Sequence, residues 1–98
     1  MKVVWSPLAQ ARAGEISDYI ARDQIHAARN WLESVFSKVK RLGSFPKSGR
    51  AVPEIRNKSI RELIHGEYRI VYQIEQHRIL ILTVRHGKRR LSRRDLRA

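Results

Sequence analysis

The stretch from Tyr68 to His86, YRIVYQIEQHRILILTVRH, constrains the fold more than any other part of the sequence, because it predicts two strands joined by a tight turn. In its first half, large apolar residues alternate with more polar ones, which is the pattern of a strand with one buried side. Residues 79–84 are apolar except for Thr83, which predicts a central strand covered on both faces. The apolar run stops at Arg85, so any site is expected at the carboxyl end of this strand.

Two amphipathic helices are predicted upstream of this hairpin. A short strand at residues 3–5 ends at Ser6-Pro7, where the serine hydroxyl can cap a helix and proline suits its first position. Apolar residues, Tyr19 among them, then recur every three or four positions to about residue 22, and again from residue 25 to Gly43. Because the joint between them is short, the two helices are expected to form an antiparallel hairpin.

The rest of the chain completes an α+β domain. Residues 43–59 form a long loop that holds four cations against the single carboxylate of Glu54, and long loops often form part of a site. A further strand is expected at residues 60–64. The predicted order is an N-terminal strand, an antiparallel two-helix hairpin and a three-stranded antiparallel sheet, with the helices on one face of the sheet.

The length of the chain indicates one domain, because 98 residues have no material for a second core. Residues 1–98 are therefore expected to form a single unit, with a basic tail at residues 88–98 that is either flexible or ordered by a partner. No segment has the length of a membrane-spanning helix or of a signal-peptide core, which predicts a cytoplasmic protein.

Charge is the strongest compositional feature. The chain has 21 Lys and Arg residues against 9 Asp and Glu residues, a net charge of +12, and this excess favours a polyanionic partner such as nucleic acid or an acidic protein. There is no cysteine, which excludes disulfides, zinc-finger spacing and thiol chemistry. Because His, Asp and Glu show no ligand spacing either, no metal or other cofactor is expected.

Five segments of the sequence also carry a resemblance to a known family: WSPLA, SGRAVPEI, IREL, YRIVY and ILTVRHGKRRL. In their order and spacing, and in overall length, the chain is similar to the RelE/ParE superfamily of toxins from bacterial type II toxin–antitoxin modules, which arrest growth. The resemblance implies a sheet of about four strands with two packed helices. It also implies a hetero-oligomer with an acidic antitoxin that wraps the toxin and masks its basic groove.

The superfamily contains two working classes, and the sequence must decide between them. RelE-like members are mRNA interferases that cut messenger RNA in the ribosome, whereas ParE-like members inhibit DNA gyrase. Metal-free RNA cleavage needs a base, an acid and cations around the phosphorane. Glu54 or a nearby carboxylate would be the base, His86 the acid and Arg69 a cation. Under either reading, target or anion binding is assigned to Arg61, Arg85, Lys88, Arg89 and Arg90.

The sequence favours the ParE-like class. RelE-like nucleases commonly place an aromatic residue just past the last strand, but no aromatic follows Tyr72 here, and the VRHG ending is similar to that of ParE-like members. Whether the protein is an enzyme stays open, because His86 could be a hydrogen-bonded strand-end residue and Arg69 a paired structural arginine. The alternatives to gyrase inhibition are a ribosome-dependent mRNA endonuclease and a non-enzymatic nucleic-acid-binding module.

Overall fold

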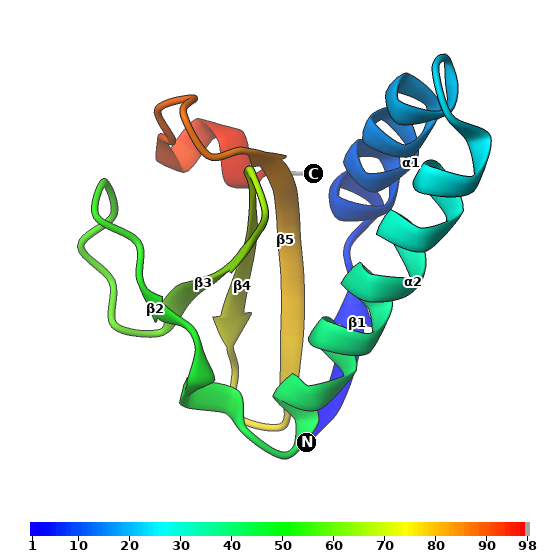
Figure 1. The fold of residues 1–98 in the computed structure, drawn as a ribbon. Coiled ribbons are helices and arrows are strands. Elements are labelled where there is room, and N and C mark those ends of the chain that lie inside the picture. Colours follow the sequence, from blue (N-terminus) through cyan, green and yellow to red (C-terminus); the bar gives the residue numbers. More distant parts are fainter. Residues whose placement is uncertain (98) are drawn as a thin grey trace.

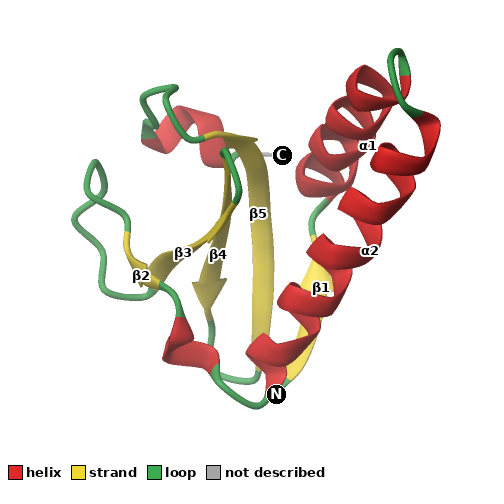
Figure 2. Cartoon of the chain, viewed as in Figure 1, coloured by secondary structure: helices red, strands yellow, loops and turns green. Residues whose placement is uncertain are grey.

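The structure is a computed structural model and describes residues 1–97. It contains one helical hairpin and one sheet, and Figures 1 and 2 show the helices on one side of the sheet and the long loop and the C-terminal segment on the other. In chain order the elements are β1 (Lys2–Trp5), α1 (Pro7–Ala21), α2 (Ile25–Lys40), the 3-10 turns η1 (Arg41–Gly43) and η2 (Pro46–Ser48), β2 (Arg50–Ala51), β3 (Ile60–His65), β4 (Tyr68–Ile74), β5 (Arg78–His86) and the 3-10 turn η3 (Arg93–Leu96).

The sheet has five strands in the order β1-β5-β4-β3-β2, which confirms the α+β prediction and adds to it. β3, β4 and β5 pair antiparallel, as expected, and β5 is an interior strand. β1 pairs parallel with β5, so the sheet is mixed. The connection between them runs through the helical hairpin and then through β2, β3 and β4, which is more than the dozen or so residues that a parallel pair requires. β2 lies inside the predicted loop, and its two residues are too few to leave a periodic signal.

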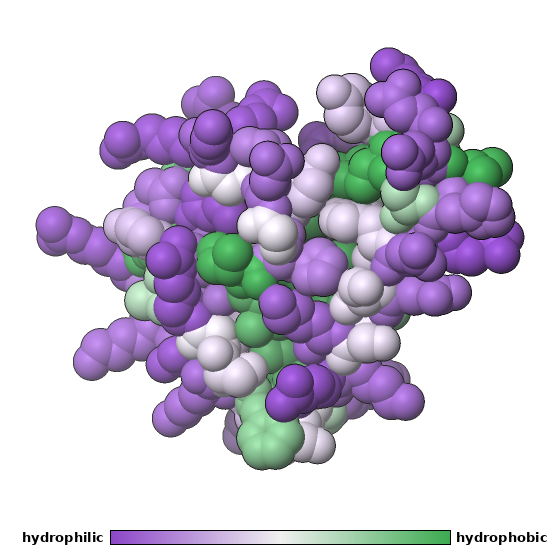
Figure 3. Space-filling model, viewed as in Figure 1, coloured by the Kyte–Doolittle hydropathy of each residue, from purple (hydrophilic) through white to green (hydrophobic). Residues whose placement is uncertain are grey.

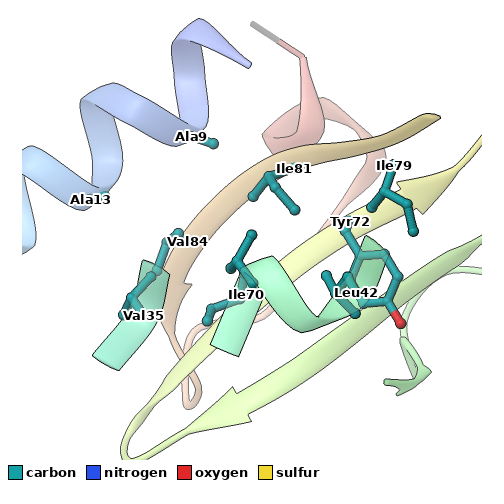
Figure 4. Close-up of a cluster of buried hydrophobic side chains, with 10 residues drawn as sticks. Ala9, Ala13, Val35, Leu42, Ile70, Tyr72, Ile79, Ile81 and Val84 are labelled. Carbon is teal, nitrogen blue, oxygen red and sulfur yellow. The ribbon is translucent and has the colours of Figure 1, made fainter. Parts of the chain in front are cut away.

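The helical hairpin packs on the sheet through small residues of α1 and branched residues of α2. Ser6 caps α1, since its hydroxyl accepts the backbone N–H of Ala9 at 3.0 Å, and it also donates to the Leu82 carbonyl of β5 at 3.1 Å. This cap therefore fixes where α1 begins relative to the sheet. Figure 4 shows the core between the two layers, and its labelled residues are Ala9, Ala13, Val35, Leu42, Ile70, Tyr72, Ile79, Ile81 and Val84.

The buried face of α1 agrees with the predicted apolar stripe only in part. Ala9, Ala13 and Ser17, spaced four residues apart, are the buried residues of α1, and Tyr19 is 65% exposed. Tyr19 was expected in the apolar stripe, and this expectation is wrong because small side chains let the helix approach the sheet closely on a neighbouring face. On α2, Ile25 and Phe36 are also exposed, so the hairpin keeps an apolar outer margin.

The face of the sheet away from the helices is covered as well. Arg69 to Tyr72 are all buried, so the expectation that β4 has only one buried side is wrong. The second face packs against the loop after β2 and against Leu91, which is 2% exposed. The basic segment after β5 thus turns back over the sheet. The buried residues of this second cluster are Val52, Ile55, Ile60, Val71, Leu82 and Leu91.

Two features are absent from the described part of the chain. No helix within residues 1–97 is long and apolar enough to cross a membrane. The same residues contain no group of three or more His, Asp or Glu side chains that could hold a metal ion.

Candidate functional site

A buried ion-pair network lies under the C-terminal segment, on the face of the sheet away from the helices. Arg69 of β4 donates from Nε to Glu62 Oε1 at 2.7 Å, and its two Nη atoms bind the two oxygens of Glu54 at 2.8 and 2.7 Å. Arg50 donates from Nε to the second oxygen of Glu62 at 2.8 Å. Glu54 also accepts the backbone N–H of Leu91 at 3.0 Å, so the network joins the loop, the sheet and the C-terminal segment.

Strand register places two arginines side by side, and each of them has carboxylate partners. Arg69 lies directly opposite Arg85 in the antiparallel pairing of β4 and β5, and two like charges in that position repel each other. Glu62 reaches Arg69 from β3, while Asp95 lies 2.9 Å from Arg85 and neutralises it from the C-terminal segment. Each arginine is therefore compensated by carboxylates that come from elsewhere in the chain.

The network changes the acid–base properties of its members. The hydrogen bonds from Arg69 hold the pKa of Glu54 at about 2, well below its usual range, and the N–H of Leu91 acts in the same direction. The same bonds, those to Glu54 first, raise the pKa of Arg69 above its already high value. A carboxylate with a pKa near 2 is a weak base at neutral pH, because efficient proton transfer needs a pKa near the working pH.

The candidate nuclease residues are engaged in structural contacts. Glu54 and Arg69 bind each other, and the Arg69 side chain is 5% exposed. The Nδ1 of His86 accepts the backbone N–H of Lys88 at 3.2 Å, and its ring lies edge-on to Tyr68 with centroids 5.6 Å apart. This is the geometry of a hydrogen-bonded strand end and of a paired structural arginine.

The depressed pKa of Glu54 gives a pH prediction. Because the pKa of Glu54 is lower in the folded state than in the unfolded state, its contribution to stability is complete above pH 4.5 and is lost as the pH falls toward 2. We expect this group to account for about 2 kcal/mol of lost unfolding free energy between pH 6 and pH 3. Urea unfolding at several pH values measures it. Glu54→Gln should show a correspondingly shallower acid dependence, and an unchanged slope would contradict the assignment.

A basic cleft of about 550 Å³ lies between the start of α1, the end of β5 and the C-terminal segment. β1 pairs with β5 only as far as Ile81, so within residues 1–97 the last residues of β5 have no strand partner on that side. Five arginines and two carboxylates line the cleft, which leaves an excess of positive charge. The charged lining residues are Arg12, Glu15, Arg85, Arg89, Arg94, Asp95 and Arg97, and His86 adds an imidazole.

The predicted anion-binding residues divide into three groups. Arg85 and Arg89 line this cleft, at the strand end where a site was expected. Lys88 and Arg90 are exposed beside it on the turn after β5. Arg61 lies apart on β3, where it donates to the Gly49 carbonyl at 2.8 Å.

Sequence reasoning missed the contribution of α1 and of the last residues to this cleft. Arg12 follows the helix cap by two turns, and Arg94 and Arg97 come from the segment that was predicted to be either flexible or ordered by a partner. Asp95 is the one carboxylate in that basic segment, and this isolation was the signal that it has an arginine partner.

The helical hairpin on one face of a mixed sheet, with a basic carboxyl end to the interior strand β5, defines a RelE/ParE-type fold. Residues 3–91 match the family described as ParE toxin of type II toxin-antitoxin system, parDE, and the chain belongs to this family. It is 35% identical to a Sinorhizobium fredii protein described as "Putative toxin Y4kP", over 88% of both chains. Its fold is similar to that in the solved structure "Chromosomal ParDE TA system from P. aeruginosa", with a TM-score of 0.75, 20% identity, and coverage of 90% of this chain and 97% of the other.

Proposed function

We propose that this ParE-family toxin arrests bacterial growth by inhibiting DNA gyrase. The observation that carries the proposal is the occupied ion-pair network: Arg69 and Glu54, two of the residues that a nuclease of this fold would need, bind each other and are largely buried. The absence of an aromatic residue after Tyr72 supports the same conclusion, because the last strand is not followed by a Phe, Tyr or Trp side chain on which an RNA base could stack.

One observation supports an alternative to gyrase inhibition. Arg85, Arg89 and His86 meet at the carboxyl end of β5, where guanidinium groups could bind a phosphate beside an imidazole, a common general acid. A RelE-like, ribosome-dependent mRNA endonuclease would use this end of the strand. If the protein has that activity, transcripts should be cut only in the presence of ribosomes, and His86→Ala should abolish the cutting.

We also propose a cognate acidic antitoxin as the physiological partner. The outer margin of the helical hairpin holds an apolar groove of about 390 Å³, which suits the apolar face of an amphipathic helix. Separately from this groove, Figure 3 shows apolar side chains at the surface toward the far end of the hairpin, with hydrophilic side chains around them. The residues that line the groove are Trp5, Gln10, Ala13, Gly14, Leu32 and Phe36. A partner that continues from this groove toward β5 would need acidic residues over the basic cleft.

Expression in growing bacteria tests both parts of this proposal. We expect the protein alone to stop growth and to induce the DNA-damage response, because blocked gyrase leaves damaged DNA. Co-expression of a small acidic protein encoded beside it should restore growth. Growth arrest with degraded transcripts and no DNA-damage response would favour the endonuclease instead, and a neutralising neighbour without acidic character would contradict the proposed partner.

A further inference from the structure

Within residues 1–97, the hollow beside η2 and the cleft at the end of β5 both carry an excess of positive charge, and their linings differ in kind. The hollow between the end of α2 and η2 has cations around an apolar floor that includes Phe45 and Leu63. The cleft at the end of β5 is lined mainly by charged and polar side chains, and its one tyrosine, Tyr68, is already packed edge-on against His86. The first lining suits an apolar anchor, whereas the second suits a fully charged ligand with no apolar part.

In the described part of the chain, the arginines of the cleft have N–H groups that no acceptor occupies. Arg89 and Arg94 are exposed and pair with no carboxylate within residues 1–97. The Arg85 side chain is 15% exposed. Its Nε and Nη1 are both buried and make no hydrogen bond of good geometry among the described residues, although Nη1 forms an ion pair with Asp95. A buried donor without an acceptor is costly, so the Arg85 guanidinium keeps hydrogen-bonding capacity for an oxyanion.

Asp95 already places an anion at this point. Its Oδ2 lies 2.9 Å from Arg85 Nη1 and also accepts the backbone N–H of Ser92 at 2.8 Å. The hydrogen bonds from Ser92 and Arg85 keep the pKa of Asp95 below its usual range, so the carboxylate is charged at neutral pH. Arg85 is thus positioned to bind an oxyanion, and Asp95 is an internal competitor for it.

From this geometry we propose that the cleft formed by Arg85, Arg89 and Arg94 binds the phosphodiester backbone of duplex DNA. Guanidinium groups match phosphate oxygens with paired donors. No aromatic side chain in the cleft is free to stack on a base, so contact is made with the backbone and does not depend on base sequence. As a contact with the DNA that gyrase holds, this site rests on the proposed function, but its affinity for DNA can be measured without gyrase.

Fluorescence anisotropy with a labelled mixed-sequence DNA duplex tests the site on the full chain between 50 and 200 mM salt. The Arg89→Gln/Arg94→Gln variant should bind about tenfold more weakly than the wild type, and its slope of log affinity against log salt should be smaller by about 2, because each lost phosphate contact removes about 0.9. The matched control Arg41→Gln/Lys47→Gln removes the same charge from the other hollow, and should change affinity less than about threefold.

A second variant, which is expected to tighten DNA binding, tests the same site in the opposite direction. Asp95→Asn keeps an oxygen that can accept from Ser92 but removes the charge that competes for Arg85, so it should tighten DNA binding about threefold. Asp18→Asn, on the exposed side of α1, is its control and should have a smaller effect. Thermal unfolding of each variant shows that the fold is intact.

Several results would overturn the proposed DNA site, and one further result would overturn only the gyrase proposal. Equal losses in the two double variants would mean that total charge alone binds DNA. Unchanged DNA affinity in Arg89→Gln/Arg94→Gln, together with a weakened complex with the acidic antitoxin, would make the cleft a protein-binding surface. If the wild type and this variant inhibit gyrase equally and bind DNA equally, the gyrase proposal stands and the DNA site falls. If DNA binding depends on the cleft but the wild type leaves gyrase active, the DNA site stands and the gyrase proposal falls.

Discussion

Glu62→Ala is expected to remove about 3–5 kcal/mol of unfolding free energy, the largest effect of any single substitution that we predict. The Glu62 side chain is fully buried and accepts hydrogen bonds from both Arg69 and Arg50. Its removal leaves a buried guanidinium without one of its carboxylates, opposite the like charge of Arg85. Because a domain of this size has about 5–15 kcal/mol of stability, thermal unfolding followed by circular dichroism should shift by more than about 12 °C.

Glu15→Ala is the matched control for Glu62→Ala. Glu15 also binds an arginine, Arg12, but that pair is exposed on α1 and should contribute less than about 1 kcal/mol. If the two variants lost similar stability, or if Glu62→Ala cost less than about 1 kcal/mol, the network would not be the structural element described above.

Gly49→Ala is expected to destabilise the protein by about 3 kcal/mol, although alanine is compatible with the backbone conformation. A methyl group at Gly49 would lie 2.6 Å from both the Glu62 carbonyl oxygen and Tyr72 Oη. Tyr72 cannot move away easily, because it is fully buried and its hydroxyl accepts the Gly49 N–H at 3.0 Å and donates to the Pro46 carbonyl at 2.7 Å. Urea unfolding measures the change.

Gly14→Ala gives the control with the opposite sign. Nothing lies within 4 Å of a methyl group at Gly14, which is in the middle of α1. Alanine there should raise the unfolding free energy by about 0.5–1 kcal/mol, since glycine costs that much in a helix interior. If Gly14→Ala and Gly49→Ala changed the unfolding free energy in the same direction, the close packing described at Gly49 would be contradicted.

The sequence predicted those elements in which apolar residues recur at a regular spacing. The helices and the β4–β5 hairpin follow from spacings of three to four residues and of two residues, and these elements were found at the expected positions. The exposed position of Tyr19 was not predictable in this way, because the buried face of α1 continues from Ala13 to Ser17, which is small and polar and gives no hydrophobic signal. Small residues allow close packing without leaving a hydrophobic pattern.

The candidate site was predictable in part, for the same physical reason. Arg85 and Arg89 follow directly from the end of the apolar run of β5. The pairing of Arg69 with Glu54, and of Glu54 with Leu91, joins residues 15 and 37 positions apart, and such contacts have no periodic signature in the sequence. The covering of the second face by the loop and the C-terminal segment depends on these contacts, so it became visible only in the structure.

The most direct test of the proposed function is a paired assay with purified toxin. Gyrase supercoiling of relaxed plasmid is measured beside messenger RNA cleavage in a ribosome-containing translation system, over the same toxin concentrations. We predict that supercoiling is blocked and that transcripts remain intact, and that the acidic antitoxin restores supercoiling. Normal supercoiling at excess toxin, with transcripts cut only when ribosomes are present, would contradict the proposal.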